Sequence, residues 1–228
     1  MAPEVPLKWS LVIPVKLLAQ AKSRLTGLAG QRRSELALAM AADTVAAAIA
    51  ASSVAAVLVV TDDPEVSEVA AALGAAVLPD QPGAGLNEAL AFGAAYAQSR
   101  WPERGRAGLA GDLPALRPWE LTSALAAAAR IGEVFVPDAD GSGTTLYAAV
   151  PGVAFRPLFG ADSRGRHLAA GAIQIDLETE GESRPAGLRQ DVDTIEDLRR
   201  AAAIGLGQRT LALLSSDGGI LALAGDDV

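Results

Sequence analysis

The sequence predicts an α/β domain with a mostly parallel β-sheet. Short apolar runs typical of strands alternate with longer helical segments as far as residue 136, a pattern that places crossover helices between parallel strands. The chain has 228 residues, 50% of them hydrophobic, which is enough to bury one full core. We expect a single domain over residues 1–214 and a flexible tail over residues 215–228, where Gly and Asp are frequent.

The strands are expected where apolar runs are short and bounded by turn residues. They lie at residues 11–15, 56–60, 76–78, 107–110 and 134–136. Beyond residue 137 the alternation becomes irregular. A further strand at residues 145–149 follows a Gly-rich segment, which favours a hairpin connection.

Capping residues mark several of the expected helices. Asp63, Pro64 and Gly74 have the order of an N-cap, a first-turn proline and a terminating glycine. Thr194 and Asp197 have the spacing of a capping box, so a late helix should begin there. The other expected helices lie at residues 34–51, 87–98 and 119–130.

Composition restricts the cofactors and partners. The chain has no cysteine and one histidine, which excludes disulfides, thiolate metal sites and multi-histidine zinc sites. A bound metal would therefore have oxygen ligands, and Mg²⁺ is the expected cofactor. The net charge of -8 argues against a general nucleic-acid binder.

The amino-terminal residues favour a cytoplasmic location. MAPEVPLK lacks the basic start of a signal peptide, and the apolar run after it is interrupted by Pro14 and Lys16. No apolar run reaches the roughly 18 to 20 residues that a membrane span needs. We expect a cytoplasmic protein that contacts neither membrane nor nucleic acid.

Ligands of open α/β sheets bind beyond the carboxyl ends of the strands. The loop after the first expected strand carries Lys16, Lys22, Ser23 and Arg24. Cations, a hydroxyl and backbone N–H groups in one loop suit a triphosphate. A solvated basic loop is the alternative, because the loop lacks the GxxxxGK[ST] motif of a P-loop.

The segment QPGAGLNEAL follows the third expected strand. Gly83 and Gly85 permit close approach of the backbone to a ligand, and the amide of Asn87 suits a nucleobase edge. A plain turn with Asn87 as the N-cap of the next helix explains the same residues.

Two acidic segments form a candidate metal site. Asp112 directly follows the fourth expected strand, and Asp191 lies in RQDVDT. Two carboxylates from distant segments are sufficient protein ligands for a hard cation. Asp112 could instead cap a helix, and Asp193 competes with Asp191 but has its own role at a helix start. We favour Asp191 as the second ligand.

Hydroxyl and cationic residues gather in the later segments PDADGSGTTL and FGADSRGRH. In the first segment, Gly141 and Gly143 precede Thr144 and Thr145, a turn that ends in two hydroxyls and that a hairpin connection also explains. The second segment adds hydroxyl, backbone and cationic groups that suit a small compound with a phosphate and a carboxylate: Gly160, Ser163, Arg164 and Arg166. For His167 we favour a hydrogen-bonded structural role over that of a catalytic base.

The chain resembles the guanylyltransferases of coenzyme F420 biosynthesis in an ordered set of segments: IPVKLLAQAKSRL, VVTDD, QPGAGLNEAL, LAGDLPAL, PDADGSGTTL, FGADSRGRH and RQDVDT. That family comprises phosphoenolpyruvate guanylyltransferase and 2-phospho-L-lactate guanylyltransferase. The resemblance runs from about residue 9 to residue 205 and implies a three-layer, Rossmann-like nucleotidyltransferase sandwich with a mostly parallel mixed sheet. The segment 178–185 is longer and more polar than the family leads us to expect.

The resemblance also implies residue roles. The nucleotide-binding residues would be Lys16, Lys22, Ser23, Arg24, Gly83, Gly85 and Asn87. Asp112 and Asp191 would hold Mg²⁺ and, with Lys22, form the catalytic set. Thr145, Gly160 and Ser163 would contact the acceptor.

The implied reaction transfers GMP from GTP to phosphoenolpyruvate, releasing pyrophosphate and forming enolpyruvyl-diphospho-5'-guanosine. A downstream transferase is the expected partner that takes this product. The alternatives are 2-phospho-L-lactate as acceptor, another acceptor on a related scaffold, and a nucleotide-binding regulator without chemistry. The sequence does not determine the oligomeric state.

Overall fold

A seven-stranded mixed sheet forms the centre of the computed structural model, which describes residues 6–20, 25, 30–81, 83–176 and 186–216. The strands are β1 (Trp9–Pro14), β2 (Val54–Val60), β3 (Ala76–Leu78), β4 (Gly105–Leu109), β5 (Glu133–Val136), β6 (Leu146–Ala149) and β7 (Ile173–Gln174), in the spatial order β3-β2-β1-β4-β6-β5-β7. Only β6 runs antiparallel to its neighbours among these strands. The predicted mostly parallel sheet and the hairpin before residue 145 are confirmed.

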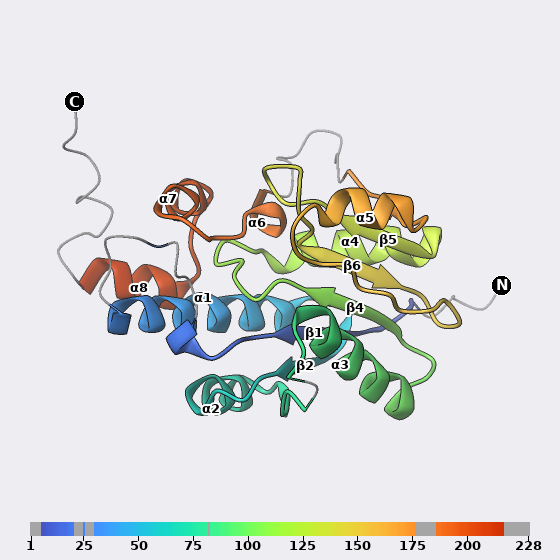
Figure 1. Ribbon diagram of the computed structural model, residues 1–228, viewed down its shortest axis with the longest axis horizontal. Coiled ribbons are helices and arrows are strands. Elements are labelled where there is room, and N and C mark those ends of the chain that lie inside the picture. Colours follow the sequence, from blue (N-terminus) through green and yellow to red (C-terminus); the bar gives the residue numbers. More distant parts are fainter. Residues whose placement is uncertain (1–5, 21–24, 26–29, 82, 177–185, 217–228) are drawn as a thin grey trace.

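The helices cover both faces of the sheet. They are α1 (Gly30–Ala50), α2 (Pro64–Leu73), α3 (Leu86–Arg100), α4 (Pro118–Ile131), α5 (Ser163–Ala169), α6 (Ala186–Arg189), α7 (Ile195–Ile204) and α8 (Gln208–Ser216), with a short 3-10 helix η1 at Leu18–Gln20. Figure 1 shows α1 and α3 on opposite sides of the central strands. The three-layer α/β sandwich is therefore confirmed.

Alternation along β1 divides the core into two layers. Leu11 and Ile13 lie in the cluster shared with α1, α2 and α4, whereas Val12 faces α3 in the other cluster. Side chains of a strand alternate between faces, so one buried strand supplies both layers. A Cβ at Gly93 of α3 would come within 2.5 Å of Val12 Cγ1, which shows how closely α3 lies on the sheet.

A third apolar cluster lies on the outer side of α1. Leu36 and Met40 of α1 meet Leu198 of α7 and Leu214 of α8 there. Asp43 of α1 reaches the start of α8, where its carboxylate accepts the N–H groups of Arg209 (3.1 Å) and Thr210 (2.8 Å). Figure 1 shows α8 lying alongside α1.

The predicted caps are confirmed. Asp63 accepts the N–H groups of Glu65 (3.0 Å) and Val66 (3.2 Å), and Gly74 ends α2 with a φ of 98°. Thr194 and Asp197 form the expected capping box at the start of α7.

Asn87 is not the N-cap of α3, which corrects one alternative from the sequence. The helix begins one residue earlier, at Leu86, and Gly85 takes the cap position. The short elements η1, α5, α6, α8 and β7 were not predicted, although the first helical residues after Thr194 were. Ser215 and Ser216 end α8, and the remaining residues of the expected tail, 217–228, lie outside the described part of the chain.

The first three strands end together at one edge of the sheet. Pro14 is in register with Val60, and Val60 with Leu78. The loops that follow β1, β2 and β3 therefore meet at this edge, as the sequence predicts. No helix within the described residues has both the length and the apolar character needed to cross a membrane.

Candidate functional site

A pocket of about 250 Å³ opens at the shared carboxyl edge of β1, β2 and β3. Its lining includes Pro14, Lys16, Asp62, Asp80, Gly83 and Gly85. Ligand pockets for drug-sized molecules have volumes of about 300–1,000 Å³. This pocket therefore has room for one ring system of a larger ligand.

The glycines of the pocket have backbone conformations that other residues rarely adopt. The φ angles are 54° at Gly83 and 131° at Gly85. A Cβ at Gly85 would also lie 3.0 Å from Glu88 Oε2. These two residues therefore shape the turn into α3, in agreement with the close backbone approach that the sequence predicts.

Asn87 is engaged within the protein. Its Nδ2 donates to Phe159 O (3.0 Å), and its Oδ1 accepts from Phe159 N (2.7 Å). The amide that was predicted to lie near guanine thus pairs with a backbone peptide. This pairing ties the start of α3 to the loop before α5.

Of the predicted basic loop, Lys16 lies in the described part of the chain and lines the pocket. Lys22, Ser23 and Arg24 lie outside the described residues. Lys16 thus links the described part of the expected phosphate-binding loop to the pocket.

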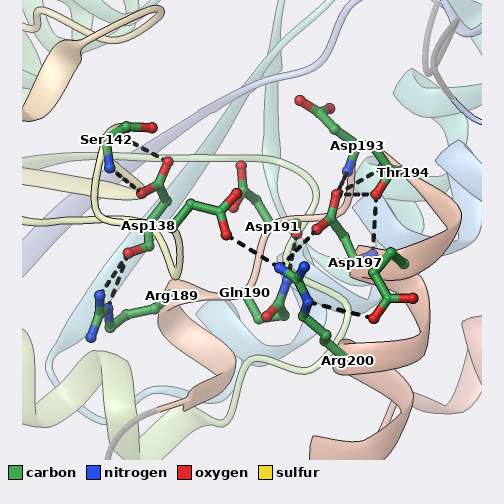
Figure 2. A network of polar contacts seen from close by, with 12 residues as sticks. Asp138, Ser142, Arg189, Gln190, Asp191, Asp193, Thr194, Asp197 and Arg200 are labelled. Carbon is green, nitrogen blue, oxygen red and sulfur yellow. Dashed lines mark hydrogen bonds and ion pairs between the residues drawn. The ribbon is translucent and has the colours of Figure 1, made fainter.

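Asp112 and Asp191 are brought together from distant segments, as predicted. The backbone oxygen of Asp112 accepts the N–H of Val192 at 3.2 Å, so the two segments run side by side. Burial and the charges of Asp112, Asp138 and Asp193 raise the pKa of Asp191 to about 7. Figure 2 shows Asp191 between Asp138 and Asp193. The Asp191 carboxylate therefore lies in an excess of negative charge.

This arrangement suits a cation that has few protein ligands. Among the described residues, no group of three or more histidine, cysteine, aspartate or glutamate side chains is placed to hold a metal ion. A hard divalent cation such as Mg²⁺ needs one or two carboxylates when water and phosphate oxygens supply its other ligands. Asp193 is exposed, and its N–H donates to Asp197 Oδ2 (3.3 Å) within the cap of α7. This geometry favours Asp191 over Asp193.

Asp138 is a residue of the site that sequence reasoning missed. Its carboxylate accepts the N–H groups of Ser142 (2.9 Å) and Gly143 (2.7 Å), and its backbone oxygen accepts from Arg189 Nη2 (2.7 Å) (Figure 2). Asp138 thus shapes the β5–β6 loop and connects it to the segment of Asp191. An aspartate before a Gly- and Ser-rich turn is the signal that could have identified it.

The residues predicted to contact the acceptor lie at the end of the β5–β6 loop and at the start of α5. The N–H of Ala110 donates to Thr145 O (2.8 Å), and the N–H of Ser163 donates to Gly160 O (3.1 Å). Thr145 and Ser163 are fully buried, while Gly160 is exposed. The Oγ1 of Thr145 has no hydrogen-bond partner among the residues that the structure describes. The hydroxyls of Thr145 and Ser163 therefore lie below the surface, and Gly160 lies on it.

His167 has the structural role that the sequence favours. Its Nε2 accepts the N–H of Leu158 (3.1 Å), so Nδ1 carries the proton toward Thr144 Oγ1 (3.1 Å). The ring is stacked against both Phe135 and Tyr147, at centroid distances of 5.2 and 4.9 Å. Burial, with a smaller effect of the Arg166 charge, lowers the pKa of His167 to about 4.

The chain matches a family model described as "Guanylyl transferase CofC like" over residues 9–214. It is 55% identical over 210 residues to a phosphoenolpyruvate guanylyltransferase from Thermomonospora curvata, covering 92% of this chain and 90% of the relative. It is 53% identical over 208 residues to the protein of the same name from Streptomyces coelicolor, covering 91% and 96% of the two chains.

The fold is also found among solved structures. The chain is similar to a protein from Desulfovibrio desulfuricans G20 described as a nucleotide-diphospho-sugar transferase. The TM-score is 0.66 and the sequence identity 16%, with 92% of this chain and 95% of the other covered. At this identity the likeness supports the nucleotidyltransferase-like fold that the sequence predicts.

Proposed function

The chain belongs to the family of CofC-like guanylyl transferases, and from this membership we infer that it transfers GMP from GTP to phosphoenolpyruvate. Pyrophosphate is released, and enolpyruvyl-diphospho-5'-guanosine forms for coenzyme F420 biosynthesis. The observation that carries this proposal is the base-sized pocket on the same sheet edge as a pair of carboxylates. The two parts of the site correspond to the two parts of a nucleotide, its base and its phosphates.

A phosphate oxygen of the acceptor attacks the α-phosphorus of GTP. The new P–O bond forms as the bond to the bridging oxygen of the β-phosphate breaks, and pyrophosphate leaves with that electron pair. The acceptor phosphate is anionic near neutral pH, so the reaction needs no protein nucleophile. The protein contributes alignment and charge neutralisation.

The pocket holds the guanine, and the basic loop follows the triphosphate. Lys16 lines the pocket, and we propose that Lys22, Ser23 and Arg24 also bind the triphosphate. Cations at this place neutralise the charge of the departing pyrophosphate.

Asp112 and Asp191 hold the divalent cation. The raised pKa of Asp191 fits this role, because the carboxylates gather negative charge that a cation would compensate. Mg²⁺ is our choice among such cations, and when bound it would withdraw charge from the phosphate oxygens. The carboxylates of Asp112 and Asp191 would supply its protein ligands.

The acceptor binds between the β5–β6 loop and the start of α5. Gly160 offers exposed backbone there, and Thr145 and Ser163 support the two segments from below. Arg166 is exposed beside Gly160, and a Cβ at Gly160 would lie 3.3 Å from its Nη2. The Arg166 cation would therefore support binding of an acceptor that carries both phosphate and carboxylate.

The proposed product has to be consumed by a second enzyme in the same compartment. We place the reaction in the cytoplasm and assign the product to a downstream transferase that consumes it there.

The test is pyrophosphate release by the purified protein with GTP, Mg²⁺ and either phosphoenolpyruvate or 2-phospho-L-lactate. The downstream transferase and its deazaflavin acceptor are present to trap the product. Release should depend on phosphoenolpyruvate and should be lost in Asp112→Asn, which removes a charge and keeps the side-chain shape. Release with 2-phospho-L-lactate alone would change the substrate, and an active Asp112→Asn protein would overturn the metal assignment.

A further inference from the structure

We propose that Asp80 recognises the guanine base, with Asp62 as the residue that positions it. This inference rests on the proposed function, since it names the specificity determinant of the same pocket. It also differs from the role expected of Asn87. The amide of Asn87 pairs with both polar groups of the Phe159 backbone, so recognition of the base falls to other polar side chains of the lining.

The lining places two carboxylates on one wall of the pocket. Asp62 follows β2 and Asp80 follows β3, and both residues contribute to the 250 Å³ cavity. Asp80 is the more enclosed of the two, being half-buried where Asp62 is exposed. The apolar residues Val60, Leu86 and Ala89 line the same cavity. A flat ring can therefore contact apolar side chains while one edge meets a carboxylate.

Hydrogen bonds hold the two aspartates in a fixed relation. Asp62 Oδ1 accepts the N–H of Asp80 (3.0 Å), and Asp80 Oδ1 accepts the N–H of Gly83 (3.3 Å). No hydrogen bond to Asp80 Oδ2 occurs among the residues that the structure describes. A carboxylate offers about four acceptor positions, so Asp80 retains acceptor capacity for a ligand.

The chemistry of the bases explains why an acidic wall selects guanine. The guanine edge presents N1–H and the N2 amino group side by side, and two adjacent donors match the two oxygens of one carboxylate. Adenine and cytosine each present a ring nitrogen that accepts, next to one amino donor. Uracil places its single N–H between two carbonyl oxygens. A carboxylate would meet an acceptor on each of these bases, which disfavours them.

Asp80→Asn tests this assignment through the nucleotide that the enzyme uses. The amide Oδ1 can still accept from Gly83 N, so the turn should be kept. Xanthine presents N1–H beside the C2 carbonyl oxygen, which an amide can pair with and a carboxylate cannot. We expect kcat/KM with GTP to fall about 100-fold or more, since charge-assisted hydrogen bonds to the base are lost. With XTP, kcat/KM should rise above that of the unaltered protein.

ITP isolates the contribution of the amino group. Inosine lacks the N2 amine and keeps N1–H, so the unaltered protein should use ITP about 10- to 100-fold less well than GTP. Asp80→Asn should lose most of this preference. Glu68→Gln is the matched control, because Glu68 is an exposed carboxylate of α2 outside the pocket lining; it should leave the GTP, ITP and XTP values unchanged.

The outcomes separate this inference from the proposed function. If the unaltered protein releases no pyrophosphate with any nucleotide, the proposed function fails. If it uses GTP and Asp80→Asn keeps the preference for GTP over ITP and XTP, the assignment to Asp80 is wrong while the function holds. A gain of XTP use in Asp62→Asn and not in Asp80→Asn would also overturn the assignment, because it would make Asp62 the direct contact.

Discussion

His167 is the one histidine of the chain, and its side chain is fully buried. Its neutral ring completes a hydrogen-bonded path from Leu158 N to Thr144 and Ser163. A charged ring would be a buried cation without a carboxylate partner among the hydrogen bonds that His167 makes in the described part of the chain. The residue therefore supports the loop before α5 and does not serve as a base at neutral pH.

We predict that His167 stays neutral down to a pH near its lowered pKa of about 4. The unfolded chain has the ordinary pKa of about 6.5, so it binds the proton first as the pH falls. The stability linked to this group is fully present above pH 6.5 and is lost as the pH falls toward 4, by about 3 kcal/mol in total. The ring signals of one histidine are unambiguous in an NMR titration, and a midpoint near 6.5 in the folded protein would contradict the prediction.

Single residues with a local role were the most predictable from the sequence. Asp63, Gly74 and the Thr194–Asp197 pair act within one turn of their own helix ends, so spacing alone identifies them. Asn87 was not predictable in this way, because its partner is Phe159, distant in the sequence. The pairing of Asp112 with Asp191 was predicted from their types and positions, because a hard cation needs two carboxylates from separate segments, and their ligand role stays a prediction.

Helix α1 supports the loop that carries Asp112. Thr44 Oγ1 accepts the N–H of Leu113 at 3.0 Å and donates to Met40 O at 2.9 Å. Thr44 is fully buried. The peptide that follows Asp112 is therefore fixed by a hydroxyl of α1.

Removing this hydroxyl should disturb the position of Asp112. In Thr44→Val the buried N–H of Leu113 loses its acceptor, at a cost of about 1–3 kcal/mol. We expect kcat to fall about tenfold and the Mg²⁺ concentration for half-maximal activity to rise, if a loop shift costs about 1.4 kcal/mol at the transition state. Thr44→Ser keeps the hydroxyl and should behave like the unaltered protein. A Thr44→Val enzyme with an unchanged Mg²⁺ requirement would refute this positioning role.

The contact between α1 and α8 allows a separate prediction on stability. Asp43 caps α8 from outside that helix, through Arg209 N and Thr210 N. Asp43→Ala should lower the free energy of unfolding by about 1–2 kcal/mol, as loss of an N-cap does. Urea denaturation measures it, with kcat preserved in the folded enzyme. Glu103→Ala removes the ion pair of the exposed Glu103 with the half-buried Arg104 (3.6 Å) and should cost under about 0.5 kcal/mol. Equal costs in the two variants would contradict the capping role.

Elements of regular length were predictable because their apolar period and caps are local. The strands around β1, β2 and β4 and the helices α1 to α4 appeared where expected, with ends shifted by a few residues. The short α5 and α6 and the two-residue β7 were missed. Segments of this length carry too little periodicity to be recognised, and they are held by tertiary contacts such as Glu120 Oε1 with Gly187 N (3.0 Å).

At the scale of the whole molecule, the sheet has two halves that carry different parts of the candidate site. The parallel strands β3, β2 and β1 carry the pocket, and β6 and β5 carry the loop beside Asp112. The sequence predicted the parallel half from its alternation. The sequence predicted the hairpin that leads into β6. It did not predict that β6 pairs antiparallel with β4 as well as with β5, because that pairing depends on residues distant in the sequence. That residues 1–214 form one domain stays a prediction.

Asn87 connects these halves, and its substitution should separate binding of the acceptor from recognition of the base. In Asn87→Asp the acceptor of Phe159 N remains, but a carboxylate oxygen faces Phe159 O in place of the donor. The loop before α5 should shift, because Arg166 Nη2 (3.0 Å) is then the remaining side-chain donor to that oxygen among the described residues. Loss of one buried hydrogen bond, about 1–2 kcal/mol, corresponds to a KM for phosphoenolpyruvate raised about 5- to 30-fold.

The preference for GTP over ITP should be unchanged in Asn87→Asp, since the base edge meets Asp80 in our proposal. Steady-state kinetics with both nucleotides and varied phosphoenolpyruvate distinguish the two effects in one set of measurements. If Asn87 instead contacted guanine, the substitution would alter the GTP-to-ITP ratio and leave the KM for phosphoenolpyruvate unchanged. That result would show that the Asn87 amide contacts guanine, and that its hydrogen bonds to Phe159 break when GTP binds.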